Sequence, residues 1–284
     1  MFRSALSVIF FCLLIAVCSY GQQLNVMSFN IRYSTASDSL NAWSYRKEKA
    51  ASQVLFHQVH ILGVQEALYE QMTDLKTLLK KYDYAGVGRD DGKTKGEFSG
   101  IFYDTSVLKL LKSSTFWLSL TPDVPGSKSW DAAITRIVTW GQFKERKSGK
   151  IFFVFNTHFD HIGKQARKES ALLLKQKIKV IAGNIPTIIT GDFNSKPFDE
   201  PIVVLTEKSD AERLTDSKEI SETNHYGPTG TFNGFKSKEI DAYPIDYIFL
   251  KGKWKVFQHA TLSQTWEGRF SSDHFPVFVR ISLN

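Results

Sequence analysis

The sequence predicts a single α/β domain in which two packed β-sheets are covered by helices. Segments with the pattern of strands outnumber segments with helical spacing, and the helical segments recur beside the strands. No linker, internal repeat or low-complexity block divides the 284 residues, and a hydrophobic content of 42% is ordinary for a folded chain. These observations favour a two-sheet sandwich over a purely parallel, doubly wound sheet.

The N-terminal part of the chain is predicted to run β-α-β-α. Residues 22–32 alternate in polarity as a half-buried strand does, and residues 54–66 carry an apolar run that ends in the polar pair Gln65-Glu66. Residues 43–57 and 70–80 instead interleave charged and apolar side chains at helical spacing. Two helices are therefore expected beside the first two strands.

The middle of the chain is predicted to contain short strands, because β-rich segments alternate there with Gly, Pro and Asp. These strands are expected at residues 84–88, 100–103, 108–117, 132–143 and 151–157. Residues 166–181 have one apolar face at helical spacing, and the helix is expected to stop near Gly183 and Pro186. A strand at residues 187–190 follows.

The C-terminal part is predicted to supply the remaining strands of the sandwich. These strands are expected at residues 245–250, 255–261 and 277–281. A polar, Gly-containing stretch at residues 209–241 precedes them, and no element is predicted within it. All the predicted elements fit into one domain.

The first residues have the pattern of a signal peptide. Arg3 provides a positive start, residues 5–17 are apolar, and small residues precede Gln22. The apolar run is shorter than the roughly 20 residues that span a bilayer, and no other segment is long enough, so stable membrane insertion is not expected. We expect export to the periplasm or the cell exterior, with residues 1–21 cleaved near Gly21 and residues 22–284 forming the folded domain.

Both cysteines of the sequence, Cys12 and Cys18, lie in this leader. Attachment of a lipid at Cys18 is the less favoured alternative, because Val17 is bulky for that processing. A mature chain without cysteine has no disulfide, no thiolate metal ligand and no cysteine nucleophile. The formal charge of the whole chain is +7, which gives weak support for anionic substrates.

Several apolar strands end in a polar residue that strand propensity disfavours. Polar side chains at such places cost stability unless they are used, although Asp and Asn also end strands through turn chemistry. The residues concerned are Asn30, Glu66, His158, Asp192 with Asn194, and Asp273 with His274. Carboxylates, amides and imidazoles without thiols predict a shared site of hard oxygen ligands and proton carriers.

Six short motifs carry a family resemblance. They are Met27-Ser-Phe-Asn-Ile31, Gln65-Glu66, Asn156-Thr-His158, Gly191-Asp-Phe-Asn194, Ile245-Asp-Tyr-Ile248 and Ser272-Asp-His-Phe-Pro276. In this order, from about Leu24 to the C-terminus, they resemble the endonuclease/exonuclease/phosphatase superfamily. The resemblance implies a DNase I-like fold, a four-layer α/β/β/α sandwich.

The finer resemblance is to the exported bacterial branch near the carbon-catabolite-repressor-4 and nocturnin-like exonucleases. It rests on the segments 86–92, 116–125 and 156–161. The inositol-polyphosphate phosphatase branch fits less well, because Ser195-Lys196 and Pro244-Ile-Asp-Tyr247 stand where that branch has its own motifs.

The resemblance implies a Mg²⁺ or Mn²⁺ site. Glu66 would be the principal ligand, helped by Asn30 and Asp273, and such oxygen donors suit these ions. The alternative for Glu66 is that it caps the helix that follows it.

The same resemblance implies roles for the catalytic residues. Asp192 would orient or deprotonate the attacking water, Asn194 would hold a phosphate oxygen, and His158 would contact the phosphate. His274, oriented by Asp246, would act as an acid or base or stabilise charge, and which group is the base stays open.

Arg136 is a further candidate, because a guanidinium binds phosphate well and this one interrupts a β-rich run. Its alternative is an edge-strand charge that faces solvent. The candidates for the substrate rim are Trp117, Trp130, Asp160 and His161.

The implied function is metal-dependent hydrolysis of phosphate esters by an activated water. The leading hypothesis is a monomeric phosphodiesterase or nuclease that acts on nucleic acid or nucleotides. The alternative is a sphingomyelinase-like phospholipid or small-molecule phosphodiesterase or phosphatase of the same fold. A non-catalytic binding protein is less favoured, because the residues of the site are intact. Residues 86–97 and 221–241, in which substrate choice would lie, do not separate these substrates.

Overall fold

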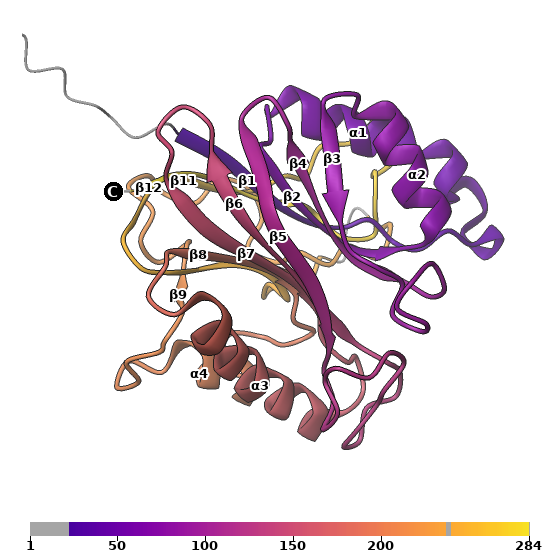
Figure 1. The fold of residues 1–284 in the computed structure, drawn as a ribbon. Helices are drawn as coiled ribbons and strands as arrows, with labels where there is room; N and C mark the ends of the chain where they lie inside the picture. The colour runs from indigo at the N-terminus through magenta and orange to yellow at the C-terminus, as the bar shows by residue number, and fades with distance from the viewer. Residues whose placement is uncertain (1–22, 237–239, 284) are drawn as a thin grey trace, which may run out of the picture.

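The computed structural model describes residues 23–236 and 240–283, which form two stacked β-sheets with helices on both outer faces (Figure 1). The strand order is β11-β12-β1-β2-β4-β3 in the first sheet and β5-β6-β7-β8-β10-β9 in the second. The predicted four-layer α/β/β/α sandwich is confirmed. The proposed signal peptide lies outside the described residues.

The first sheet and its helices come mostly from the N-terminal part of the chain. Its strands are β1 (Gln23–Asn30), β2 (Ile61–Ala67), β3 (Tyr82–Ala85), β4 (Phe98–Asp104), β11 (Trp254–Thr261) and β12 (Val277–Leu283). Its helices are α1 (Lys47–Phe56) and α2 (Tyr69–Leu78), preceded by the 3₁₀ turns η1 (Ala36–Asn41) and η2 (Trp43–Tyr45).

The second sheet comes from the middle of the chain and one later strand. Its strands are β5 (Leu108–Trp117), β6 (Ile137–Glu145), β7 (Ile151–His158), β8 (Thr187–Asp192), β9 (Thr215–Asp216) and β10 (Asp246–Lys251). The helices α3 (Lys164–Ala182) and α4 (Glu200–Thr206) cover its outer face. None of the described helices is both long and apolar enough to cross a membrane.

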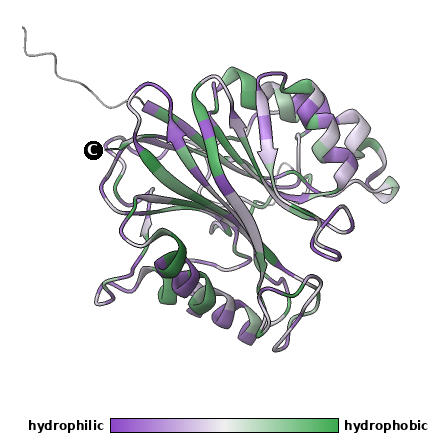
Figure 2. Ribbon diagram, in the orientation of Figure 1, coloured by the Kyte–Doolittle hydropathy of each residue, from purple (hydrophilic) through white to green (hydrophobic). Residues whose placement is uncertain are grey.

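Three apolar clusters hold the four layers together. One packs α1 and α2 on the first sheet, one packs α3 and α4 on the second, and one fills the space between the sheets. Successive strand residues serve different clusters, as in β1, where Val26 faces the second sheet and Met27 faces the helices. Several strands accordingly carry hydrophobic stretches, whereas β3 is mainly pale and purple and α3 alternates hydrophobic and hydrophilic residues (Figure 2).

The predicted strand at residues 132–143 begins later than expected, because β6 starts at Ile137. The backbone N–H groups of Ala133 and Ile134 donate to the Asp160 carboxylate at 3.0 and 3.2 Å and so hold this segment as a loop. The helix α4 and the two-residue strand β9 were not predicted. Both are too short for a periodic pattern to show.

Strand direction brings the polar strand ends to one edge of the sandwich. β1 and β2 run parallel, as do β7 and β8, so each pair ends at the same edge of its sheet. β10 runs antiparallel to β8 and begins with Asp246 opposite Asp192, at the same edge. Residues adjacent in space at this edge are therefore far apart in the chain.

Candidate active site

The inward-facing side chains of the strands change from apolar to polar toward this edge. In β8, for example, Ile188 belongs to the cluster between the sheets, whereas Thr190 and Asp192 on the same face are polar. The polar ends line a cavity of about 660 Å³. Its lining includes Arg32, Tyr33, Glu66, Glu97, Ile134, Arg136, His158, His161, Asp192, Asn194, Phe232, Ile245, Asp273 and His274.

Asn30 joins the two sheets at the floor of the site. Its amide nitrogen donates to Glu66 Oε1 and to Asp192 Oδ2, both at 3.0 Å, and lies 3.5 Å from His274 Nε2. Its amide oxygen accepts from the backbone N–H of Arg32 at 3.0 Å. In this arrangement Asn30 presents its nitrogen to the site and orients the carboxylates of Glu66 and Asp192.

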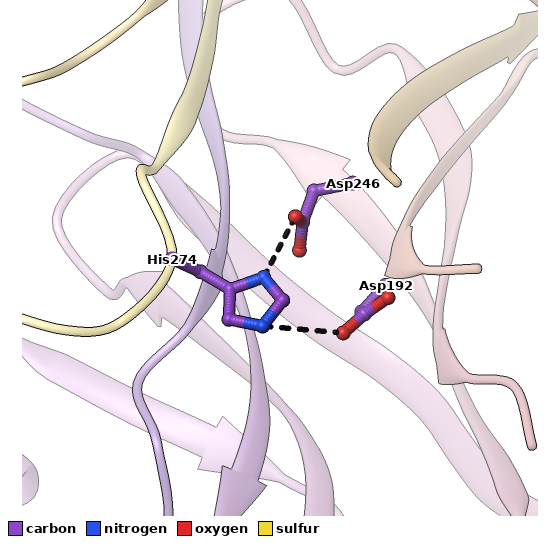
Figure 3. A group of neighbouring side chains, drawn as sticks. All are labelled: Asp192, Asp246 and His274. Atoms are coloured by element: carbon purple, nitrogen blue, oxygen red, sulfur yellow. Dashed lines mark hydrogen bonds and ion pairs between the residues drawn. The ribbon is translucent and has the colours of Figure 1, made fainter. Parts of the chain in front are cut away.

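His274 and Asp246 form a buried ion pair beside Asp192 (Figure 3). His274 Nδ1 lies 2.9 Å from Asp246 Oδ2, and its Nε2 faces Asp192 Oδ2 at 3.8 Å. Burial alone would lower the pKa of His274, but the carboxylates of Asp246, Asp192 and Asp273 raise this pKa well above its ordinary value. The surrounding carboxylates therefore favour the protonated form of His274.

His158 lies in the same cavity and has the opposite ionisation. Burial lowers the pKa of His158 well below its ordinary value, and the charges of Arg136 and His274 lower it further. Asn194 Nδ2 lies 3.0 Å from His158 Nε2. An amide nitrogen only donates, so the neutral His158 accepts at Nε2 and carries its proton on Nδ1.

Asp192 stands between the two histidines. Its Oδ1 accepts from the Asn194 backbone N–H at 2.9 Å, and its Oδ2 lies 3.4 Å from His158 Nε2. Burial and the negative charge of Asp246 raise the pKa of Asp192 to about 7. A carboxyl group with this pKa exchanges its proton near neutral pH, as a general base does.

Glu66 and Asp273 line the cavity and offer carboxylate oxygens to a divalent cation. Arg32 Nη1 lies 3.9 Å from Glu66 Oε2, and Arg32 Nε lies 3.8 Å from Asp273 Oδ2. Burial and, to a lesser degree, the charge of Glu66 raise the pKa of Asp273. Carboxylates are hard oxygen donors, which suit Mg²⁺ or Mn²⁺.

A second acidic group, Asp192, Asp246 and His274, has ligand atoms within 4.8 Å of one another. It is the weaker candidate for a metal site. A histidine must be neutral to bind a metal, and the carboxylates around His274 favour its protonated form.

Arg136 reaches the cavity from the loop before β6 and is only 5% exposed. Its Nη1 lies 3.9 Å from Glu97 Oε2, and its Nη2 lies 3.3 Å from His161 Nδ1. The solvent-facing alternative for Arg136 is wrong, because its side chain is buried and lines the cavity. A guanidinium here can bind a phosphate oxygen.

Arg32, Glu97 and Phe232 line the cavity but were not among the predicted site residues. Arg32 could have been found, because it follows Asn30 by two residues at the end of a predicted strand. Phe232 packs edge-on against His274, with ring centroids 5.1 Å apart, and nothing in its sequence neighbourhood signals this contact.

The four candidates for the substrate rim lie in different surroundings. His161 lines the cavity, whereas Trp130 lines a separate cavity beside α3. Trp117 and Asp160 are buried, at 4% and 1% exposure, and bond to backbone groups. Their role is to hold loops, so only His161 remains a rim residue.

The comparisons with known proteins agree with this geometry. The family model of the endonuclease/exonuclease/phosphatase family matches residues 27–274. The structure of a family protein from Bacteroides vulgatus has a TM-score of 0.88 and 39% identity, and covers 93% of this chain and 100% of that chain. The mannosyl-6-phosphatase of Bacteroides thetaiotaomicron has a TM-score of 0.87 and 42% identity, and covers 92% and 100%.

A more distant relative is the 3′-5′-exoribonuclease subunit of the CCR4-Not complex of Mycosarcoma maydis. It is 26% identical over 229 residues, which are 62% of this chain and 34% of that protein. The predicted likeness to the carbon-catabolite-repressor-4 group is thus confirmed at distant identity. The family model matches most of the length of the chain, and the fold and the site agree with this match. The chain therefore belongs to the endonuclease/exonuclease/phosphatase family.

Proposed function

We propose that the protein is a divalent-metal-dependent phosphatase that hydrolyses small phosphorylated molecules, with sugar phosphates as the substrate class. One observation carries the proposed chemistry. A single cavity gathers carboxylates for a cation, a carboxyl group with a pKa of about 7, a histidine whose charged form its neighbours favour, and a buried arginine. These groups are the ones that hydrolysis at phosphorus requires.

Each group has a role in this proposal. Glu66 and Asp273 hold the ion, which when bound neutralises the phosphate and polarises its bonds. Asp192 takes a proton from the attacking water, because its pKa allows it to do so near neutral pH. The neighbouring carboxylates favour the protonated form of His274, and in this form His274 stabilises developing negative charge.

Arg136 orients the phosphate, and Asn194 orients His158. Asn194 Nδ2 donates to His158 Nε2 and to the carbonyl of Phe159, both at 3.0 Å, and Arg136 Nη1 lies 3.9 Å from Glu97 Oε2. A guanidinium and a bound cation would together align the phosphate for in-line attack by the water. No covalent intermediate is required.

Two observations favour a small substrate over a polymer. A cavity of about 660 Å³ lies in the range of small-molecule sites, which is roughly 300–1,000 Å³. The mannosyl-6-phosphatase resembles this chain over its whole length, whereas the exoribonuclease subunit resembles it over a third of its own length. A nuclease or other phosphodiesterase is the second candidate, and it rests on the latter resemblance.

A substrate panel tests the proposal. We expect Mg²⁺ or Mn²⁺ to support phosphate release from mannose 6-phosphate or glucose 6-phosphate at rates at least about 100-fold above those on bis-p-nitrophenyl phosphate, sphingomyelin and single-stranded RNA or DNA. His274→Ala should abolish turnover and leave the fold intact by circular dichroism. Faster cleavage of RNA, DNA or the diester than of any sugar phosphate would select the second candidate instead.

A further inference from the structure

Asn156 places a fully buried amide between the two sheets, close to the active site. It lies on β7, on the same face as His158 two residues later, and its side chain is 0% exposed. The rest of the space between the sheets is mainly apolar. A buried polar group in such a place is costly unless its bonds are made.

All four hydrogen-bonding positions of this amide are filled. The nitrogen of Asn156 donates to the backbone carbonyls of Val64 and Gly100, both at 2.8 Å. Its oxygen accepts from Gln65 Nε2 at 2.7 Å and from Thr190 Oγ1 at 2.9 Å. Three of these partners belong to the first sheet, and Thr190 belongs to the second.

The two carbonyls mark the start of a β-bulge. Val64 and Gly100 are the last regular pair of β2 and β4, after which the register shifts so that Ala67 pairs with Phe98. One extra residue is thus inserted in β2. Glu66, inside the bulge, has a φ of 62°, which is unfavourable for a residue with a side chain. Such bulges occur beside active sites, where they redirect a side chain.

The sheets approach each other closely at this network. A Cβ atom on Gly63 would lie 2.1 Å from Thr190 Oγ1 and 2.7 Å from Asn156 Oδ1. The absence of a side chain on Gly63 therefore lets the polar groups of the two sheets meet. Thr190 precedes Asp192 by two residues, so the network joins the segment that carries Glu66 to the one that carries Asp192.

We propose that Asn156 is a positioning residue, which holds the bulge of β2 so that the Glu66 carboxylate stands at a fixed place relative to Asp192 and His158 on the opposite sheet. The inference rests on the proposed metal-dependent function of Glu66. Asn156 itself touches neither substrate nor ion. Its contribution is to stabilise an unfavourable backbone conformation and to set the distance between the two halves of the site.

Asn156→Asp tests this role with little change in size. The carboxyl group cannot make both donations to Val64 and Gly100, so the bulge should relax. Asn25→Asp is the matched control, because Asn25 is also buried and its amide donates to the carbonyls of His57 and Gln58, at 2.8 and 3.1 Å. It lies at the other end of β1, away from Glu66.

The main readout is the dissociation constant for Mn²⁺, measured by calorimetry on the full mature protein. We expect Asn156→Asp to weaken Mn²⁺ binding by about 10-fold or more, as is typical when the groups that orient a ligand are removed. The dissociation constant of Asn25→Asp should stay within about 2-fold of the wild-type value, which is small beside the loss expected for Asn156→Asp. Thr190→Val, which removes one bond of the network, provides a milder variant if Asn156→Asp does not fold.

Hydrogen exchange of residues 64–67 supplies a second readout that needs no metal. Faster exchange there in Asn156→Asp but not in Asn25→Asp supports the proposal. Wild-type Mn²⁺ affinity and exchange in Asn156→Asp, or equal losses in the two variants, would overturn it. If the wild-type protein itself does not bind Mn²⁺, the proposed function fails, and the exchange result still reports on the bulge.

Discussion

The two histidines of the site show how the environment of a residue decides its chemistry. His158 and His274 line the same cavity, and both are buried. Asp246, at 2.9 Å, favours the protonated form of His274, whereas burial and the positive charges of Arg136 and His274 favour the neutral form of His158. Their places at strand ends and in the family motifs predicted that both belong to the site, but not that their pKa values shift in opposite directions.

Asp246→Asn tests the charged state of His274. Without the negative charge of Asp246, the pKa of His274 should fall toward its ordinary value, and the proposed stabilisation of the transition state should weaken. We expect kcat to fall by about 100-fold, as in the loss of one group that stabilises transition-state charge. An NMR titration of the His274 imidazole, together with kcat, checks both effects. An unchanged imidazole pKa would contradict the assignment.

At the scale of the element, the strand ends were predictable and the irregular segments were not. Asn30, His158 and Asp192 each end a strand whose apolar run is visible in the sequence, and Glu66 is the last residue but one of its strand. All four line the site or bond across it. The bulge of β2 was not predicted, because the residues within it, Gln65 and Glu66, include neither Gly nor Pro. The late start of β6 depends on Asp160, which lies 23 residues beyond Ile137 in the chain.

Gly63→Ala tests the close approach of the two sheets. The new methyl group would overlap Thr190 Oγ1, so the sheets must separate locally, and overpacking of this kind costs about 1–3 kcal/mol or more. Gly183→Ala is the control, because a Cβ there meets nothing within 4 Å, although the φ of 56° is itself unfavourable. Chemical denaturation should show a larger loss of unfolding free energy for Gly63→Ala. An equal loss would contradict close packing at Gly63.

His259 on β11 should make the protein sensitive to acid. Burial lowers the pKa of His259 to about 3, from 6.5 in the unfolded chain, so the unfolded state takes up this proton first. The contribution of His259 to the free energy of unfolding is complete above pH 6.5 and is lost as the pH falls toward 3. Between pH 7.5 and 4.5 the free energy of unfolding should fall by roughly 2–3 kcal/mol for this reason.

Thermal melts of wild type and His259→Gln at these two values of pH test this contribution. The glutamine variant should be less stable than wild type at pH 7.5 and should lose less stability on acidification. If thermal stability depends on pH in the same way in the variant and in wild type, His259 is excluded as a cause of acid sensitivity.

At the scale of the whole molecule, the sandwich places the halves of one site on different sheets. The first sheet supplies Glu66 and Asn30, and the second supplies His158, Asp192 and Asp246. Periodicity predicted two sheets covered by helices, and the family resemblance supplied the order of the layers. The strand order itself depends on pairings between segments far apart in the chain, such as β1 with β12, which local patterns do not encode.

The predicted export of the protein has a direct test at this scale. Mass spectrometry of the protein purified from its native host should give an N-terminus at Gln22, after removal of residues 1–21. An intact Met1 in protein recovered from the cytoplasm would contradict the signal peptide. A lipid on Cys18 would instead select the lipoprotein alternative.

The most direct measurement is phosphate release from mannose 6-phosphate by metal-free protein as Mg²⁺ or Mn²⁺ is added back. We predict no turnover without the ion, full turnover when it is restored, and a requirement for about 10-fold more metal in Glu66→Gln, because that variant loses the principal carboxylate ligand. Turnover that is indifferent to metal in wild type, or a metal requirement that Glu66→Gln does not change, would contradict a metal-dependent site built on Glu66.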